Sequence, residues 1–153
     1  MTDSQIIKAE NSHIWQRETH EHYVEPYWCS ARLFEEEIFS DVIYDPCCGF
    51  GNILKSADAA GYRTLASDIV DRGYSGTTVQ DFLARIGAAG ADIVCNPPFD
   101  QFLPFAEQAL RMAHHKVAMI WLVRTLPAAR WLQDTPLAKI LFLTPRPSMP
   151  PGH

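Results

Sequence analysis

The sequence lacks the features that mark several large classes of protein. No stretch among its 153 residues approaches the roughly 20 consecutive apolar residues of a membrane-spanning helix. The N-terminus, Met1-Thr2-Asp3-Ser4, has neither the basic nor the apolar region of a signal peptide. Neither an internal repeat nor a low-complexity linker is present. These absences favour a cytoplasmic protein with one globular domain and no contact with a membrane.

Cysteine and histidine are sparse and unsuitably spaced for a metal site. The four cysteines, at positions 29, 47, 48 and 95, form no CxxC pair, and adjacent cysteines do not chelate zinc in the usual way. The pairs at 20/22 and 114/115 are the main histidine groupings, and neither has a cysteine cluster at metal spacing. We therefore predict buried, reduced cysteines and no metal.

An excess of positive charge is also missing. The formal net charge is -5, whereas proteins that bind nucleic acid tightly on their own usually present a basic face. The C-terminal third still offers basic residues for a local patch: Arg124, Arg130, Lys139 and Arg146.

Short apolar runs alternate with helical stretches along most of the chain. Residues 1–22 are polar and predict a flexible arm, while 23–153 predict a single domain that begins with a helix near 31–39. The predicted strands are 42–44, 63–69, 77–79, 91–95, 117–123 and 140–143, and the predicted helices between and after them are 52–60, 82–86, 102–114 and 127–132. This order is typical of an α/β fold with a doubly wound, mostly parallel sheet.

The loop after the first predicted strand has the composition of a ligand site. It runs Asp45-Pro46-Cys47-Cys48-Gly49-Phe50-Gly51-Asn52, and its two glycines let the backbone turn sharply and approach a ligand. No Gly-Lys-Ser/Thr follows, so it is not a phosphate loop. The carboxylate of Asp45 favours a cationic or amino-bearing ligand.

Two further acids follow later strands. Asp68 ends the second strand about 20 residues after the glycine loop, where a carboxylate can accept hydrogen bonds from ribose hydroxyls. Asp81 could accept a hydrogen bond from an adenine amino group, or could equally cap a helix.

The fourth predicted strand ends in Asn96-Pro97-Pro98-Phe99. Two successive prolines stiffen the backbone and remove two N–H donors, so the loop is rich in acceptors. It can present the Asn96 side-chain oxygen and the Pro97 carbonyl to an amino group, while Phe99 can stack on a planar base.

Together these motifs resemble the S-adenosylmethionine-dependent amino-methyltransferases, especially the N6-adenine DNA methyltransferases of phage and prophage type. The motif order, with an aromatic entry at 23–28 before both loops, is similar to that of their gamma group. The resemblance implies a Rossmann-like fold, S-adenosylmethionine as cofactor, and catalysis at Asn96, Pro97, Pro98 and Phe99. The cofactor-binding residues that it implies are Tyr23, Pro26, Trp28, Asp45, Pro46, Cys47, Gly49, Gly51, Asn52, Asp68, Ile69, Asp81 and Phe82.

The chain departs from that family after the sixth predicted strand. It has no candidate for the family's seventh strand and no separate target-recognition domain, which indicates either a minimal enzyme, monomeric or homodimeric, or a truncated relative. Three hypotheses for the function follow. The first is methylation of N6 of an adenine flipped out of DNA. The second is methylation of RNA guanine or protein glutamine, and the third is a non-catalytic cofactor-binding module.

Overall fold

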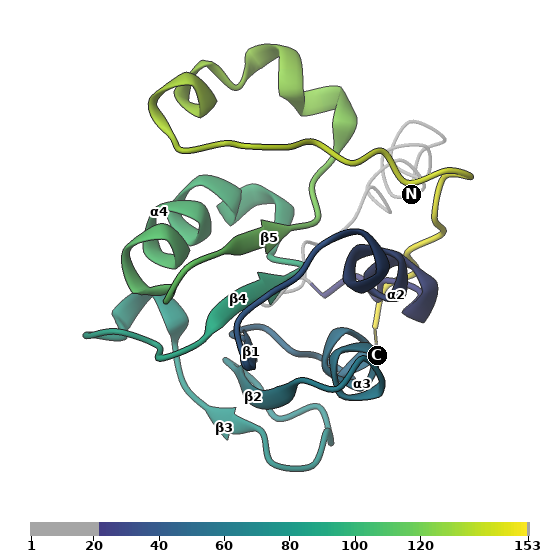
Figure 1. The fold of residues 1–153 in the computed structure, drawn as a ribbon, viewed down its shortest axis with the longest axis vertical. Helices are drawn as coiled ribbons and strands as arrows, with labels where there is room; N and C mark the ends of the chain where they lie inside the picture. The colour runs from purple at the N-terminus through teal and green to yellow at the C-terminus, as the bar shows by residue number, and fades with distance from the viewer. Residues whose placement is uncertain (1–21, 153) are drawn as a thin grey trace, which may run out of the picture.

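Five parallel strands form the centre of the molecule. The computed structural model describes residues 22–152, so the arm predicted for residues 1–22 lies outside this range except for its last residue. The sheet has the strand order β3-β2-β1-β4-β5 (Figure 1). Its strands are β1 (Val42–Asp45), β2 (Arg63–Asp68), β3 (Thr78–Val79), β4 (Asp92–Cys95) and β5 (Val117–Met119). Every pairing is parallel, which confirms the doubly wound α/β fold.

Helices cover both faces of this sheet. The helices α2 (Tyr27–Glu36) and α3 (Asn52–Ala59) pack together on one side, and α4 (Phe102–Met112) lies on the other (Figure 1). Pro26 precedes α2 with φ -61°, which suits its rigid ring to the start of a helix. Gly51 precedes α3 in the left-handed conformation, with φ 81°.

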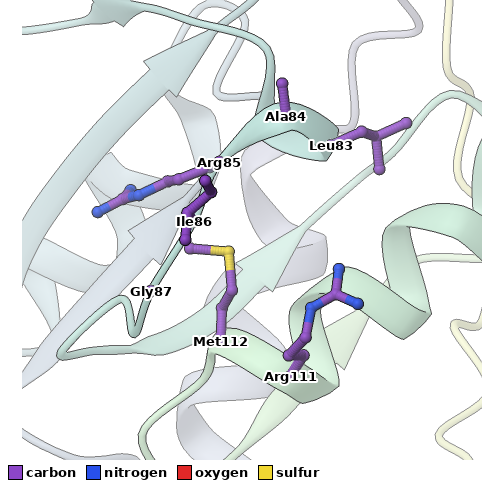
Figure 2. Close-up of a pocket in the computed structure, with 7 residues that line it drawn as sticks. All are labelled: Leu83, Ala84, Arg85, Ile86, Gly87, Arg111 and Met112. Carbon is purple, nitrogen blue, oxygen red and sulfur yellow. The ribbon is translucent and has the colours of Figure 1, made fainter.

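The connection from β3 to β4 borders a cavity at the amino-terminal edge of the sheet. A short 3-10 helix η1 (Phe82–Ala84) leads into an exposed loop, and the cavity of about 400 Å³ lies between this loop and the end of α4 (Figure 2). Its lining residues are Leu83, Ala84, Arg85, Ile86, Gly87, Arg111 and Met112. None of the residues predicted to bind cofactor or substrate borders it.

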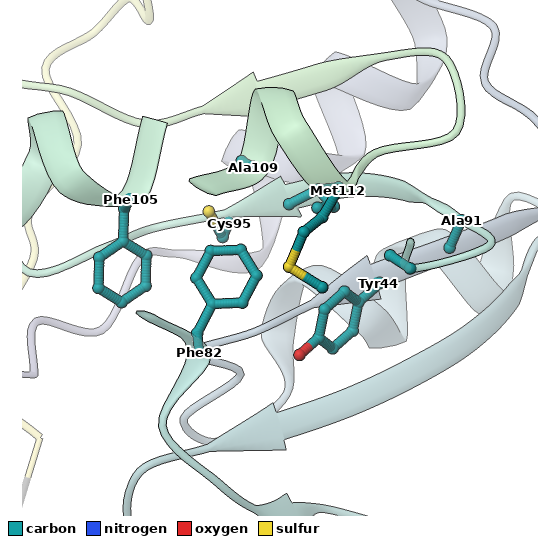
Figure 3. Close-up of a cluster of buried hydrophobic side chains, with 9 residues drawn as sticks. Tyr44, Phe82, Ala91, Cys95, Phe105, Ala109 and Met112 are labelled. Atoms are coloured by element: carbon teal, nitrogen blue, oxygen red, sulfur yellow. The ribbon is translucent and has the colours of Figure 1, made fainter. Parts of the chain in front are cut away.

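The core follows the alternation of side chains along each strand. Tyr44 and Cys95 face α4, where they pack with Phe82, Phe105 and Met112 (Figure 3). The residue before each, Ile43 and Val94, faces the opposite side and packs with Ile53 and Leu54 of α3. Successive residues of a strand point to opposite faces, so each of these strands contributes to both cores.

The C-terminal third departs from the predicted order. Residues 140–143, predicted as a sixth strand, form no strand, and the predicted helix at 127–132 is replaced by the 3-10 helices η3 (Val123–Ala128) and η4 (Arg130–Asp134). Both predictions were wrong. Among the described residues β5 pairs with β4 alone, so its apolar residues are only partly buried. Trp121 belongs to the apolar run predicted as a strand over 117–123 but lies beyond the end of β5. Its ring stacks on Phe102 with 4.2 Å between ring centroids, which anchors the C-terminal segment.

After η4 the chain runs back across the molecule (Figure 1), and its last described residues pair with residues 22–24. Tyr23 and Pro151 form an antiparallel bridge, with Val24 N–H donating to the Pro150 carbonyl at 2.9 Å. No helix among residues 22–152 is both long and apolar enough to cross a membrane.

Candidate functional site

The loops predicted to carry chemistry meet at one edge of the sheet. β1 lies between β2 and β4, and all three strands run parallel, so their carboxyl ends are neighbours. The Gly49 N–H donates to Asp68 Oδ2 at 2.8 Å, and Cys47 Sγ donates to the Asn96 carbonyl at 3.4 Å. The glycine loop, the acid at the end of β2 and the Asn-Pro-Pro-Phe segment therefore form one continuous site.

Within the glycine loop, the conformation depends on its acid and its glycines. Asp45 Oδ1 accepts a hydrogen bond from the Cys47 N–H at 3.0 Å, which tightens the turn directly after β1. Gly49 has φ 53°, a left-handed value that disfavours side chains. Asn52 opens α3, and its Nδ2 donates to the Glu25 carbonyl at 2.9 Å. This last contact ties the segment before α2 to the glycine loop.

Asp68 is almost fully buried and is engaged by backbone donors. In addition to the bond from Gly49, its Oδ1 accepts from the Val70 N–H at 3.2 Å, and the residue is 5% exposed. The carboxylate therefore fixes the glycine loop in place. Each oxygen keeps further acceptor capacity, so a contact with ribose stays a prediction.

Ile69, Asp81 and Phe82, which the resemblance also implies as cofactor-binding residues, lie in different surroundings. Ile69 is 47% exposed beside Asp68, whereas Phe82 is buried in the core against Tyr44 and Phe105. Asp81 Oδ1 accepts from the Leu83 N–H at 2.9 Å, so it caps η1. This was one of its two predicted roles; a contact of Asp81 with adenine, and cofactor binding by Ile69 and Phe82, stay predictions.

Asn96 has one end of its amide fully engaged and the other end unpaired. Its Nδ2 donates to the Tyr23 carbonyl at 2.9 Å and to Glu25 Oε2 at 3.0 Å. A carbonyl can only accept, so the amino end of the amide must point toward Tyr23. The Asn96 Oδ1 is buried and has no hydrogen-bond partner among residues 22–152. A buried acceptor without a partner is costly and calls for a donor from outside the described residues.

The aromatic ring of Phe99 already has a neighbour. The Tyr23 ring stacks on it with centroids 5.6 Å apart and planes 12° apart. Pro97 is buried, and Pro98 leads into the short 3-10 helix η2 (Phe99–Gln101) that precedes α4. A planar ligand at Phe99 must therefore use its other face or displace Tyr23.

Three buried carboxyl groups gather at the glycine loop: Asp45, Glu25 and Asp68. Burial raises the pKa of Asp45 well above its ordinary value, and the nearby carboxyls of Glu25 and Asp68 raise it further. Burial likewise raises the pKa of Glu25, opposed by its hydrogen bond with Asn96. A cationic ligand would relieve this repulsion between buried acids, so the loop favours positively charged groups.

The cysteines of the site are poor nucleophiles. A hydrogen bond with Cys95, followed by burial, raises the pKa of the Cys47 thiol, and burial raises the pKa of Cys48 to about 11. All four cysteines are free, and Cys95 is fully buried at the end of β4. No group of three or more potential metal ligands gathers within the described part of the chain.

Three features of the site escaped the sequence analysis. His22 lies against Gly49 and Tyr74 lies against Gly51, so both glycines face rings of the protein itself. Glu25 stands inside the aromatic entry segment but was assigned no role there. Its partner Asn96 is 71 positions away, and no local pattern reports such a pairing. The third feature is the pairing of residues 22–24 with the C-terminal segment.

Comparison with known proteins shows the fold. No family model and no curated protein matches the sequence. One similar solved structure is described as "a putative RNA methyltransferase PH1948 from Pyrococcus horikoshii"; it has a TM-score of 0.54 at 18% identity, covering 86% of this chain and 82% of that chain. A second, Thermoplasma acidophilum 1320, has a TM-score of 0.52 at 18% identity, covering 86% and 78% respectively. The chain therefore shares the α/β fold of these two proteins.

Proposed function

We propose that the protein transfers a methyl group from S-adenosylmethionine to an exocyclic amino nitrogen, with N6 of adenine in DNA as the leading acceptor. The observation that carries this proposal is the unpaired Asn96 Oδ1, buried and held at the sheet edge beside the glycine loop. An amino group is the donor that this oxygen lacks. The acids of the loop favour the positive charge of the cofactor.

The chain's residues divide between the two ligands. The Asp45 carboxyl and the Gly49–Gly51 backbone would hold the cationic part of the cofactor, and Asp68 would face its ribose. When bound, S-adenosylmethionine supplies an electrophilic methyl group. Asn96 Oδ1 and the Pro97 carbonyl would accept the two hydrogens of the amino group, which restores the nitrogen lone pair otherwise delocalised into the ring.

Asn96 would stabilise the positive charge that develops on the attacking nitrogen, in addition to positioning the amino group. The nitrogen becomes positive as it forms its bond to the methyl carbon, and preorganised oxygens in a buried site stabilise that charge more strongly than water does. The electron pair of the carbon–sulfur bond would stay on sulfur, and the excess proton would leave the nitrogen for solvent. Positioning the two groups supplies much of the remaining rate.

A second acceptor class is RNA, including the amino group of guanine. The similar protein of Pyrococcus horikoshii is described as "a putative RNA methyltransferase", and it shares its fold over most of this chain. A protein glutamine and a non-catalytic cofactor-binding role are the further alternatives. The nature of the methylated product separates the adenine, guanine and glutamine acceptors, whereas cofactor binding without turnover marks the non-catalytic role.

The test is methyl transfer from isotopically labelled S-adenosylmethionine to DNA, RNA and protein acceptors, with the product identified by mass spectrometry. We expect N6-methyladenine in DNA. Asn96→Ala should lose turnover by roughly 100-fold or more while it still binds the cofactor in calorimetry. Gln133→Ala, an exposed position in η4, is the control and should match the wild type. Wild-type turnover in Asn96→Ala would refute the proposed site, and a labelled guanine or glutamine would replace adenine as the acceptor.

A further inference from the structure

We propose that Glu25 is the positioning residue of this site, which orients the Asn96 amide so that Oδ1 faces the methyl acceptor. The orientation is a property of the protein alone, whereas its effect on catalysis rests on the proposed function. Glu25 belongs to neither of the two loops that bear the motifs, and it precedes Asn96 by 71 positions.

The contacts leave the amide little freedom. Both hydrogens of Asn96 Nδ2 have acceptors, Glu25 Oε2 at 3.0 Å and the Tyr23 carbonyl at 2.9 Å. Glu25 is 6% exposed, so water competes little for its carboxylate. Oδ1, at the opposite end of the same planar group, is left buried without a partner.

Glu25 is itself held from two sides. Its carbonyl accepts a hydrogen bond from Asn52 Nδ2 at the start of α3, and the residue after it, Pro26, begins α2. The carboxylate is therefore presented from a backbone that both helices fix. Asn96 in turn follows β4 directly, so the Glu25–Asn96 bond joins α2, α3 and the sheet at one point.

Without Glu25 only the Tyr23 carbonyl would hold the amide in this orientation. The oxygen and nitrogen of an asparagine amide have almost the same size, so rotation by half a turn is opposed mainly by hydrogen bonding. A rotated Asn96 would present N–H groups to the N–H groups of the acceptor, which is repulsive. Glu25 in its charged form also strengthens Oδ1 as an acceptor, because a hydrogen bond to a carboxylate polarises the amide.

Two substitutions separate the acceptor role of Glu25 from simple packing. Glu25→Gln keeps an oxygen that can accept from Asn96 Nδ2, whereas Glu25→Leu keeps comparable bulk and removes the acceptor. The control is Glu36→Gln, because Glu36 lies on α2 but is about half exposed and forms an ion pair with Arg32 at 3.5 Å. Circular dichroism establishes that each variant is folded.

The first readout does not depend on activity. In ¹⁵N-labelled protein the side-chain amide resonances of Asn96 are assigned by their loss in Asn96→Ala. In Glu25→Leu we expect their protection from hydrogen exchange to fall at least about tenfold, because one of two hydrogen bonds is gone. In Glu25→Gln and Glu36→Gln the protection should stay close to that of the wild type.

The second readout is kinetic. In Glu25→Leu we expect kcat to fall roughly 100-fold with little change in KM for the acceptor, since misorientation affects the transition state more than binding. Glu25→Gln should recover most of that loss. Unchanged exchange protection of the Asn96 side-chain amide in folded Glu25→Leu would overturn the proposal. Equal kcat losses in Glu25→Leu and Glu25→Gln would also overturn it. Reduced exchange protection of the Asn96 amide in Glu25→Leu, together with a wild type that transfers no methyl group, would support the orienting role of Glu25 and refute the proposed function instead.

Discussion

The imidazole ring of His22 lies against the backbone of Gly49, in the space that a Cβ at position 49 would need. The same ring meets Phe50 edge-on, with centroids 5.2 Å apart and planes 87° apart. His22 Nε2 is buried and has no hydrogen-bond partner in the described part of the chain. The ring is thus held by packing alone on this side, and a ligand that approaches the Gly49 backbone must displace it.

Gly49→Ala tests how much the steric contact with His22, in addition to the backbone conformation, requires glycine at position 49. Alanine at φ 53° is strained, and its methyl group would also collide with His22, so we expect a loss of roughly 2 to 5 kcal/mol in unfolding free energy. Gly61→Ala is the matched control, because Gly61 has φ 95° but nothing within 4 Å of an added Cβ. That variant should lose only about 1 to 2 kcal/mol, from backbone strain alone. Equal losses by chemical denaturation would show that His22 does not confine position 49.

His22→Ala should bind S-adenosylmethionine faster and up to about tenfold more tightly. If the ring must leave before the ligand approaches Gly49, the binding-competent fraction of the protein is reduced, and removing the ring restores it. Burial, followed by the nearby charge of Arg72, lowers the pKa of His22, so the ring is neutral at pH 7 and the effect should not depend on its charge. Stopped-flow binding measures the association rate, with exposed His114→Ala as control. Weaker binding by His22→Ala would instead make His22 a ligand contact.

Asp45→Asn should stabilise the free protein and abolish cofactor binding. The folded-state pKa of Asp45 lies well above its ordinary value of 3.8, chiefly through burial. The stability that protonated Asp45 contributes is therefore complete below that value and is lost as pH rises through the raised pKa. Asparagine stays neutral, so the variant's advantage should grow across this window and reach roughly 1 to 2 kcal/mol at neutral pH.

Two measurements check this expectation. Chemical denaturation across a pH series should show the difference between Asp45→Asn and wild type widening with pH and then becoming constant. Calorimetry should show that wild-type affinity for S-adenosylmethionine falls as pH drops, because protonated Asp45 cannot pair with a cation. A variant that is less stable than wild type at neutral pH would contradict a buried, destabilising carboxylate.

Local patterns were sufficient to predict the sheet edge where the site lies. Residues 42–44 and 91–95 were predicted as strands, and parallel strands bring the residues that follow them to one edge. Asp45 and Asn96 could therefore be placed together although 50 residues separate them. The helix after the glycine loop ends at Ala59, within a residue of its expected end, because Gly61 follows.

Interactions between distant residues were the part that local patterns could not predict. The bond from Asn96 to Glu25 and the contact of His22 with Gly49 depend on how the entry segment returns to the sheet. The error at residues 140–143 has a different cause. An apolar run predicts a strand only if a sheet edge is available to pair with it, and here the described chain crosses above the sheet without joining β5. Three of its residues, Ile140, Leu141 and Phe142, are consequently exposed.

A chain that ends at residue 149 should lose order in the entry segment while the sheet is retained. Val24 N–H donates to the Pro150 carbonyl at 2.9 Å, and Gly152 N–H donates to the His22 carbonyl at 2.8 Å, so both bonds disappear with the last four residues. We expect exchange protection of the Val24 amide to fall at least about tenfold. The Cys48 amide, which donates to the Ser67 carbonyl at 3.0 Å within the site, is the internal control and should keep its protection. Because Tyr23 lies between these two bonds and its carbonyl holds Asn96, protection of the Asn96 side-chain amide should also decrease. Full protection of Val24 in the shortened chain would mean that residues 22–24 are ordered by Glu25 and α2 without help from the C-terminal segment.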